Sequence, residues 1–371
     1  MQASDLAAPA LRGLTPYQPG KPIAELAREL GLRDIVKLAS NENPLGPSPA
    51  ALAAVERTLA ELHRYPDGSG YALKAALAET LAVEPNQITL GNGSSELLEL
   101  VARAFLTPGS AALFSEHAFA VYAIVTQATG ARGVTVPAHD GSRGPRYGHD
   151  LEAMAERVDG ATRVVFIANP NNPTGTYLKT AELRRFLTGL PESTLAVVDE
   201  AYFEYVEAPD YPNTLTWLAD FPNLVVTRTF SKIYGLAGLR VGYAVSSPAI
   251  AELLDRVRQP FNVNGLALAA AEAALADQEH LARALRVNRA GLRQLSEALT
   301  ARQLNPLPSV GNFLSFDLGR PAAPIYDALL RHGVIVRPIA NYGLPQHLRV
   351  TVGTAEQNAA FLAALDRVLE P

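Results

Sequence analysis

From residue 88 onward, short and uniformly apolar segments alternate with segments of helical spacing. The apolar segments predict strands at 88–90, 111–114, 133–136, 164–168, 195–198, 223–229 and 239–245. The segments between some of them predict helices at 97–105, 119–129 and 150–158. Apolar runs without alternation are typical of strands that are buried on both faces. The pattern therefore predicts an α/β fold with a mostly parallel sheet that helices cover on both sides.

Four polar motifs each follow one of these expected strands directly. They are Gly91–Glu96, Asn169–Gly175, Asp199–Tyr202 and Thr229–Lys232. In open parallel sheets, ligands bind beyond the carboxyl ends of the strands. One such motif would mean little, but four in one sheet predict a shared site.

The two ends of the chain follow a different pattern. Helices are expected at 23–30, 50–62 and 71–81, and a break at 260–265 is a plausible hinge. Beyond it, helices at 278–304, 323–332 and 356–369 and strands at 312–316, 333–337 and 348–353 predict a smaller α+β domain. The expected organisation is an N-terminal arm at 1–36 that joins the small domain, a large ligand-binding domain at 37–264, and a small domain at 265–371.

Composition excludes several classes of protein. The net charge is −5 with no cluster of basic residues, so nucleic acid is not an expected partner. There is no long apolar run and no signal-peptide pattern, so neither a membrane span nor secretion is expected. The chain has no cysteine, which removes thiol chemistry and suits a cytoplasmic protein. Its seven histidines are scattered, so no metal site is expected.

Lys232 is a candidate nucleophile. An isolated lysine near the end of an apolar strand loses hydration, which lowers its pKa and frees the amine to form a Schiff base. Ser231 and Arg240 on either side suit an anion such as a cofactor phosphate. The alternative for a Ser-Lys pair is an ordinary surface turn.

Asp199 follows four apolar residues, so its carboxylate is expected to be desolvated and to need a cation. A protonated pyridine nitrogen would supply that cation; the alternative is that Asp199 caps a following helix. Tyr202 and Asn172 are placed to donate hydrogen bonds to a ring oxygen. The alternative for Asn172 is an ordinary turn residue, because its segment is rich in residues that favour turns.

Other candidates also carry a structural alternative. The backbone N–H groups of Ser94 and Ser95 would form an anion site at a helix N-terminus, or Ser94 would simply cap that helix. Phe119 could stack on a pyridine ring or belong to the core. Tyr65 lies in a turn where a surface position is common, and Arg349 on an apolar strand must meet an anion or point outward.

These motifs, in this order, resemble the histidinol-phosphate aminotransferase family of fold-type I aminotransferases, which depend on pyridoxal phosphate (PLP). The resemblance spans almost the whole chain. It rests on Asn41-Glu-Asn-Pro-x-Gly, Arg64-Tyr-Pro-Asp, Gly91-Asn-Gly-Ser-x-Glu, Asn169-Pro-Asn-Asn-Pro-Thr-Gly, Val198-Asp-Glu-Ala-Tyr, Thr229-x-Ser-Lys, Ala237-Gly-Leu-Arg-x-Gly-Tyr and Leu348-Arg-Val-Thr-Val-Gly.

The resemblance implies a role for each cofactor residue. Lys232 would be the Schiff-base lysine and the proton carrier, and Asp199 would face the pyridine nitrogen. The remaining cofactor contacts would be Asn172 and Tyr202 on the ring oxygen, Phe119 on the ring face, and Ser94, Ser95, Ser231 and Arg240 on the phosphate. Phe119 stands where many relatives carry tyrosine, so stacking is expected without a hydroxyl contact; Ser95 stands where aspartate is frequent.

It also implies the substrates and the assembly. L-histidinol phosphate and 2-oxoglutarate would become imidazole-acetol phosphate and glutamate. Arg349 would bind the anionic group of the substrate, with Arg337, Tyr17 and Asn43 nearby. Tyr65 would reach the cofactor phosphate from the other subunit of a homodimer with shared active sites.

Three alternatives remain at this stage. The nearest is an aromatic amino acid aminotransferase of the same subfamily, and a PLP-dependent decarboxylase would differ in its product. A non-catalytic PLP-binding sensor normally has a fused DNA-binding module, for which this chain has no basic segment.

Overall fold

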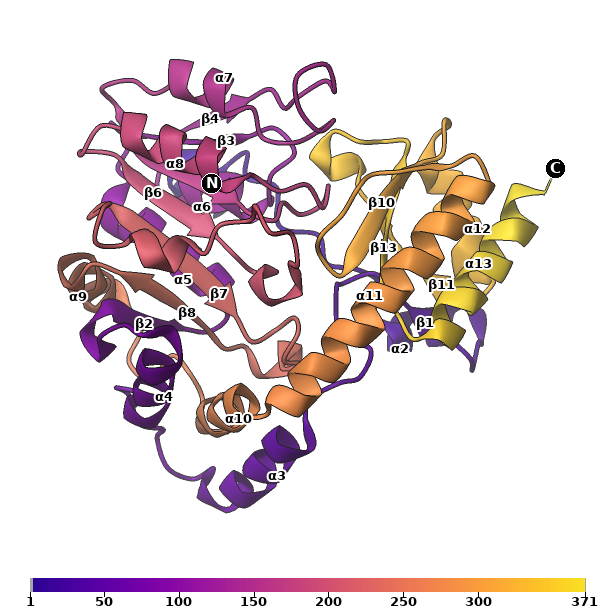
Figure 1. Cartoon of the computed structure of the whole chain (residues 1–371), viewed down its shortest axis with the longest axis horizontal. Coiled ribbons are helices and arrows are strands. Elements are labelled where there is room, and N and C mark those ends of the chain that lie inside the picture. Colours follow the sequence, from indigo (N-terminus) through magenta and orange to yellow (C-terminus); the bar gives the residue numbers. More distant parts are fainter. Residues whose placement is uncertain (1–2, 371) are drawn as a thin grey trace.

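The computed structural model describes residues 3–370 and contains a large seven-stranded sheet and two smaller sheets. We call the large sheet and the helices packed on it the large unit, and the two smaller sheets with their helices the small unit. In Figure 1 the large unit lies on the left and the small unit on the right, and the long helix α11 (Gln278–Ala301) runs diagonally toward the small unit.

The large sheet has the strand order β2-β8-β7-β6-β5-β3-β4. Six of the seven strands are parallel to one another, and β8 (Gly242–Ser246) alone runs antiparallel to both of its neighbours. The other strands are β2 (Ile88–Gly91), β3 (Ala111–Ser115), β4 (Arg132–Val136), β5 (Thr162–Ala168), β6 (Leu195–Asp199) and β7 (Leu224–Thr229). The predicted mostly parallel α/β sheet is thus confirmed.

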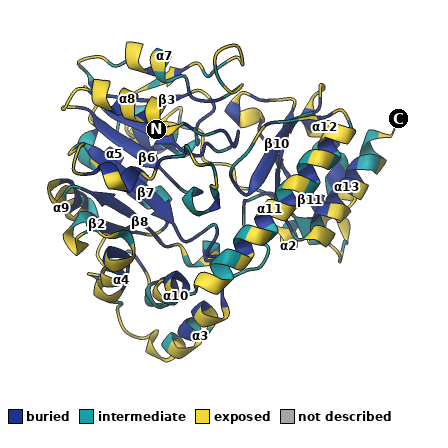
Figure 2. Cartoon of the chain, in the orientation of Figure 1, coloured by how far each residue is buried: buried dark blue, intermediate teal, exposed yellow. Residues whose placement is uncertain are grey.

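Both faces of this sheet are covered, which explains the uniformly apolar strands. Val164, Phe166 and Val197 belong to one buried cluster, with helices α5 (Ser94–Phe105), α6 (Val121–Ala128) and α9 (Pro248–Val257). Alternate positions such as Val165 and Val198 belong to a second cluster on the opposite face. Figure 2 shows the central strands β6, β7 and β8 as buried, whereas the edge strand β4 is mostly exposed. The helices of the second face are α3 (Pro49–Thr58), α4 (Tyr71–Leu81), α7 (Leu151–Glu156), α8 (Thr180–Gly189) and α10 (Gly265–Ala276).

The four polar motifs meet at one edge of the sheet, as predicted. Strands β2, β5, β6 and β7 are mutually parallel, so their carboxyl ends face the same side. The single antiparallel strand, β8, starts at that edge and brings Gly242 beside Gly91 at the end of β2. The four motif segments and the start of β8 therefore converge at this edge.

The small unit is built from both ends of the chain. Its four-stranded antiparallel sheet has the order β12-β13-β10-β9, with β9 (Asn305–Pro306), β10 (Phe313–Asp317), β12 (Arg337–Pro338) and β13 (His347–Thr351). The N-terminal strand β1 (Val36–Lys37) pairs with β11 (Val334–Ile335), and α2 (Ile23–Leu30) contributes Leu26 to a small core with Ile335. Helices α11, α12 (Ala322–Arg331) and α13 (Ala355–Leu369) complete it.

The packing of α10 bears on where the two domains divide. Its alanines lie in the same core as residues of α3 and α4, so α10 packs with the large unit. We therefore propose that the predicted small-domain boundary at 265 belongs nearer the start of α11, with residues 23–37 still assigned to the small unit. No helix in the described range is both long and apolar enough to cross a membrane.

Candidate active site

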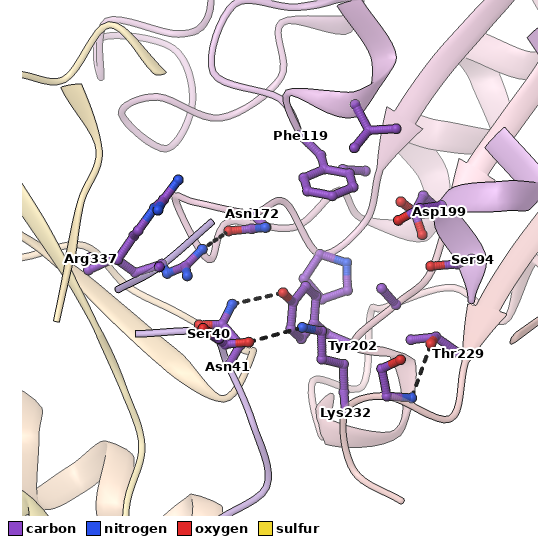
Figure 3. A pocket seen from close by; sticks show the side chains of 18 of the residues that line it. Ser40, Asn41, Ser94, Phe119, Asn172, Asp199, Tyr202, Thr229, Lys232 and Arg337 are labelled. Atoms are coloured by element: carbon purple, nitrogen blue, oxygen red, sulfur yellow. Dashed lines mark hydrogen bonds between the residues drawn. The ribbon is translucent and has the colours of Figure 1, made fainter. Parts of the chain in front are cut away.

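A cavity of about 460 Å³ lies at the carboxyl edge of the large sheet, against the small unit. Twelve of the fourteen predicted site residues line it, and Figure 3 shows several of them converging from both units. These are Tyr17, Ser94, Ser95, Phe119, Asn172, Asp199, Tyr202, Ser231, Lys232, Arg240, Arg337 and Arg349. The cavity thus unites residues from the N-terminal arm to the last strand.

The Lys232 amine reaches the middle of this cavity. Its Nζ donates a hydrogen bond to the Ser40 carbonyl at 3.3 Å and lies 5.6 Å from the centre of the Tyr202 ring. Burial, followed by the positive charge of Arg349, lowers the pKa of Lys232 to about 8. About a tenth of the amine is therefore neutral at pH 7, far more than for an ordinary lysine, and the neutral form is the one that acts as nucleophile or proton acceptor.

Asp199 ends strand β6 and is 5% exposed. Its two carboxylate oxygens accept hydrogen bonds from Tyr122 Oη at 2.9 Å and Thr227 Oγ1 at 3.0 Å. Burial raises the pKa of Asp199, and these hydrogen bonds oppose that shift. Both donors are neutral, so the carboxylate is well oriented but its charge is not balanced by them. A cationic ligand group in the cavity would balance it.

Tyr202 and Asn172 are each held by a residue that links them to the small unit. The Tyr202 hydroxyl accepts a hydrogen bond from Asn41 Nδ2 at 2.8 Å, and the Asn172 side-chain oxygen accepts one from Arg349. Burial raises the pKa of Tyr202, so its hydroxyl remains protonated. Tyr202 can consequently act as a hydrogen-bond donor to a ligand.

One end of the cavity is suited to an anion. Helix α5 begins at Ser94, so the first N–H groups of Ser94 and Ser95 have no partner within the helix. Arg240 Nη1 donates to Ser231 Oγ at 3.1 Å, which joins the two other candidate phosphate residues. Gly93 has φ +79°, and a Cβ there would lie 2.2 Å from Arg240 Nη2. Glycine is therefore required for the arginine to approach the helix terminus.

The opposite end carries two arginines. Arg337 on β12 and Arg349 on β13 are directly opposite each other in the antiparallel ladder, and both are buried. Arg349 donates to the Ala39 carbonyl at 2.7 Å, while its Nε is buried without a hydrogen-bond partner among the described residues. Like charges at opposed positions repel, so this pair favours an anionic ligand.

Two aromatic residues flank these arginines. Tyr17, from the N-terminal arm, lies edge-on to Phe119, with ring centres 6.2 Å apart. The Arg337 guanidinium lies 6.0 Å from the centre of the Tyr17 ring and donates to the Gln18 carbonyl at 2.5 Å. The arm thus closes one side of the cavity, and Phe119 presents its ring to the interior (Figure 3).

Two predicted residues lie outside the cavity wall. Asn43 ties its own loop to the segment after Lys232 instead, since its Nδ2 donates to the Ile233 carbonyl at 2.6 Å and its Oδ1 accepts from the Leu45 N–H at 3.0 Å. We therefore replace Asn43 as a site residue by Asn41, which lines the cavity. Tyr65 is 82% exposed and stacks on Phe261, so it cannot serve the cavity of its own chain.

Sequence reasoning missed three residues that hold the others in place: Asn41, Tyr122 and Thr227. Asn41 belongs to the Asn-Glu-Asn-Pro segment, so its motif is visible in the sequence, but only the fold shows that Asn41 rather than Asn43 lines the cavity. Thr227 is two positions before Thr229, on the same face of β7. Tyr122 resembles any core aromatic in the sequence, and only the fold shows that it meets Asp199.

The arrangement fits PLP. The anion site at α5, the buried carboxylate of Asp199 and the amine of Lys232 match the phosphate, the pyridine nitrogen and the aldehyde of that cofactor in chemical type. Gly93 supports the fit, because the lack of a side chain there lets the Arg240 guanidinium lie against the helix terminus, which places the cation and the first N–H groups of α5 at one anion site.

Comparison with known proteins gives consistent results. The family model "Aminotransferase class I and II" matches residues 33–365. The chain is 66% identical to histidinol-phosphate aminotransferase 2 of Methylococcus capsulatus over the full length of both, and 57% identical to histidinol-phosphate aminotransferase 1 of Nitrosococcus oceani over 98% of this chain and 97% of that one. Among solved structures, histidinol-phosphate aminotransferase from Sinorhizobium meliloti in complex with pyridoxal-5'-phosphate aligns with a TM-score of 0.89 at 32% identity, covering 98% and 97% of the two chains.

Proposed function

The chain belongs to the histidinol-phosphate aminotransferase family of class I and II aminotransferases, and from this premise we propose how its residues carry out the reaction. The enzyme uses PLP to move an amino group from L-histidinol phosphate to 2-oxoglutarate, giving imidazole-acetol phosphate and glutamate. The observation that supports this function most directly is a single cavity that holds Lys232 together with Asp199 and an opposed pair of arginines.

Each end of the cavity has a proposed ligand group. The cofactor phosphate would be held by the start of α5 and by Ser231 and Arg240. Asp199 would hold the positive charge of the pyridine nitrogen, while Asn172 and Tyr202 would donate to the ring oxygen and Phe119 would pack on the ring. When bound, PLP supplies the electron sink that stabilises the carbanion left after the substrate loses its proton.

Lys232 carries the proton in this proposal. Its Nζ would accept a proton from the substrate carbon and release it again within the site, and burial favours the neutral form that accepts, since it lowers the pKa of this amine to about 8. The Ser40 carbonyl and the Tyr202 ring keep the amine in the cavity.

The two arginines are proposed to bind the substrate anion. Histidinol phosphate carries a phosphate ester where an amino acid carries its α-carboxylate, so one arginine can serve both half-reactions. Arg349 fits that role, because it is buried and its Nε is free within the described chain. Arg337, on the neighbouring strand, would supply the second positive charge that a dianionic phosphate needs.

Arg337→Ala tests the choice of substrate. A hydrogen bond to a charged group contributes roughly 1.5–3 kcal/mol, so we expect kcat/KM for histidinol phosphate to fall about ten- to a hundredfold. The losses for glutamate and phenylalanine should be smaller, since each presents only a carboxylate at this end. Steady-state kinetics with the three substrates measures the difference.

The matched variant is Arg349→Ala, which should weaken all three substrates together. Equal losses from Arg337→Ala on all three would remove Arg337 as a phosphate selector. That result would favour the aromatic amino acid aminotransferase of the same subfamily.

We propose that the active enzyme is a homodimer in the cytoplasm. A group of large apolar side chains is exposed around α3 and α4: Leu52, Leu59, Leu62, Tyr65, Tyr71 and, stacked on Tyr65, Phe261. A second copy of the chain would cover this surface and would receive Tyr65 at its cofactor phosphate. A cytoplasmic location suits a chain without cysteine.

Subunit mixing tests the shared site. In a heterodimer of a Lys232→Ala chain and a Tyr65→Phe chain, one site combines an intact Lys232 with an intact Tyr65. We expect the mixed, refolded sample to be more active than the average of the two parent samples. If Tyr65→Phe is impaired alone and mixing recovers nothing, Tyr65 does not act across subunits.

A further inference from the structure

Asn41 connects the active-site tyrosine to the last strand of the small unit. It is 1% exposed, lines the cavity and has a left-handed backbone conformation with φ +56°. Its backbone N–H donates to Thr351 Oγ1 at 2.9 Å, and its carbonyl accepts from Asn312 Nδ2 at 2.9 Å. Thr351 lies two residues after Arg349 on β13, so both side chains emerge from the same face of that strand.

The hydrogen bonds around Asn41 have defined directions. Thr351 Oγ1 already accepts the Asn41 N–H, so its own proton is available to Asn41 Oδ1, which lies 3.2 Å away. The oxygen of the amide therefore faces Thr351, and its nitrogen faces Tyr202. Because an amide nitrogen only donates, the Tyr202 oxygen must accept from Asn41 Nδ2 at 2.8 Å.

Asn41 therefore does not accept the Tyr202 proton, which is left to donate to a group in the cavity. A hydroxyl that accepts from one side directs its own O–H elsewhere, and the Tyr202 hydroxyl lies in the cavity wall (Figure 3). We propose that Thr351 and Asn41 are positioning residues that fix the direction of the Tyr202 hydroxyl, so that its proton points to the ring oxygen of the cofactor. The inference rests on the proposed role of Tyr202.

The proposal makes β13 responsible for two tasks. Arg349 on this strand binds the substrate anion, and Thr351 on the same strand orients the tyrosine through Asn41. Without the hydroxyl of residue 351, the Asn41 amide is free to turn over and present its oxygen to Tyr202. Tyr202 would then donate to Asn41 rather than to the cofactor.

The test uses the visible absorbance of the PLP-loaded enzyme without substrate, titrated against pH. A donor to the ring oxygen stabilises negative charge there, so its loss raises the pH midpoint of the absorbance change. Tyr202→Phe should raise this midpoint. Thr351→Val, which keeps the shape but lacks the hydroxyl, and Asn41→Gly, which tolerates φ +56°, should each raise it by about half to one pH unit.

Two controls make the test specific. Thr351→Ser keeps the hydroxyl and should keep the wild-type midpoint. In a Tyr202→Phe background, Thr351→Val and Asn41→Gly should add no further shift, because there is no hydroxyl left to orient. Circular dichroism checks that each variant is folded, and using two independent variants protects the test against one that does not fold.

The outcomes separate this inference from the proposed function. If Tyr202→Phe raises the midpoint while both single variants leave it unchanged, or shift it equally in the Tyr202→Phe background, the positioning role is wrong and the role of Tyr202 stands. If Tyr202→Phe itself leaves the midpoint unchanged, both the role of Tyr202 and this inference fall.

Discussion

Replacing Lys232 with alanine is expected to lower kcat by about four orders of magnitude or more, because the variant loses both the nucleophile and the proton carrier. Lys232 is the only lysine among the described residues that line the cavity, so no neighbouring amine can substitute. Turnover is measured as the rate at which glutamate forms from 2-oxoglutarate and histidinol phosphate. Borohydride treatment of the PLP-loaded wild-type enzyme should fix the cofactor on Lys232, as peptide mapping would show.

The matched control is Lys179→Ala, since Lys179 is exposed and pairs with Asp210 on the surface. This variant should keep wild-type turnover. A borohydride label on any lysine other than 232, or appreciable turnover by Lys232→Ala, would contradict the assignment.

Asp199→Asn is expected to retain the fold and lose about two to three orders of magnitude in kcat. The amide has the same shape; its oxygen can still accept from one of the hydroxyls of Tyr122 and Thr227, and the other hydroxyl can rotate to accept from the amide nitrogen. The neutral amide cannot balance a pyridinium charge, which is an electrostatic loss of the kind that costs this much. Steady-state kinetics and thermal unfolding of the same preparation measure the two effects.

Tyr122→Phe serves as the control for this prediction. It removes one hydrogen bond from Asp199 but leaves the negative charge, so it should lose much less activity than Asp199→Asn. Near-wild-type activity in Asp199→Asn would mean that Asp199 has only a structural role.

Most of the large sheet and its ligand edge could be predicted, because the relevant signals are local. Buried strands such as β5 and β6 are uninterrupted apolar runs, and each ends at a polar motif. The carboxyl-edge rule then brought Asp199 and Lys232 together without knowledge of the strand order. The helix expected from residue 150 is α7, and Asp150 caps it by accepting from the Ala153 N–H.

The misses came from contacts between residues far apart in the sequence. The sequence does not distinguish Asn41 from Asn43 as a site residue. The distinction comes from the hydrogen bonds of Asn41 to Thr351 and Tyr202, which exist only in the folded chain. The alanine-rich helix α10 has no strong polar face, so its pattern gave no sign that it packs between α3 and α4. No element was predicted for the segment that forms α8, where charged residues interrupt the apolar spacing.

The edge position of β2 has a consequence for how the protein is made. Its only neighbour in the sheet is β8, and Gly91 pairs with Gly242, a residue from much later in the chain. During synthesis, β2 emerges from the ribosome long before its partner, and the start of α5 has no Arg240 beside it. The proposed phosphate site is therefore completed late. Its parts are brought together by closure of a long loop, and such closure is slow compared with the formation of local structure. A nascent chain that ends before Ser231 would contain most of the parallel strands but would lack Ser231 and Arg240 from the phosphate site.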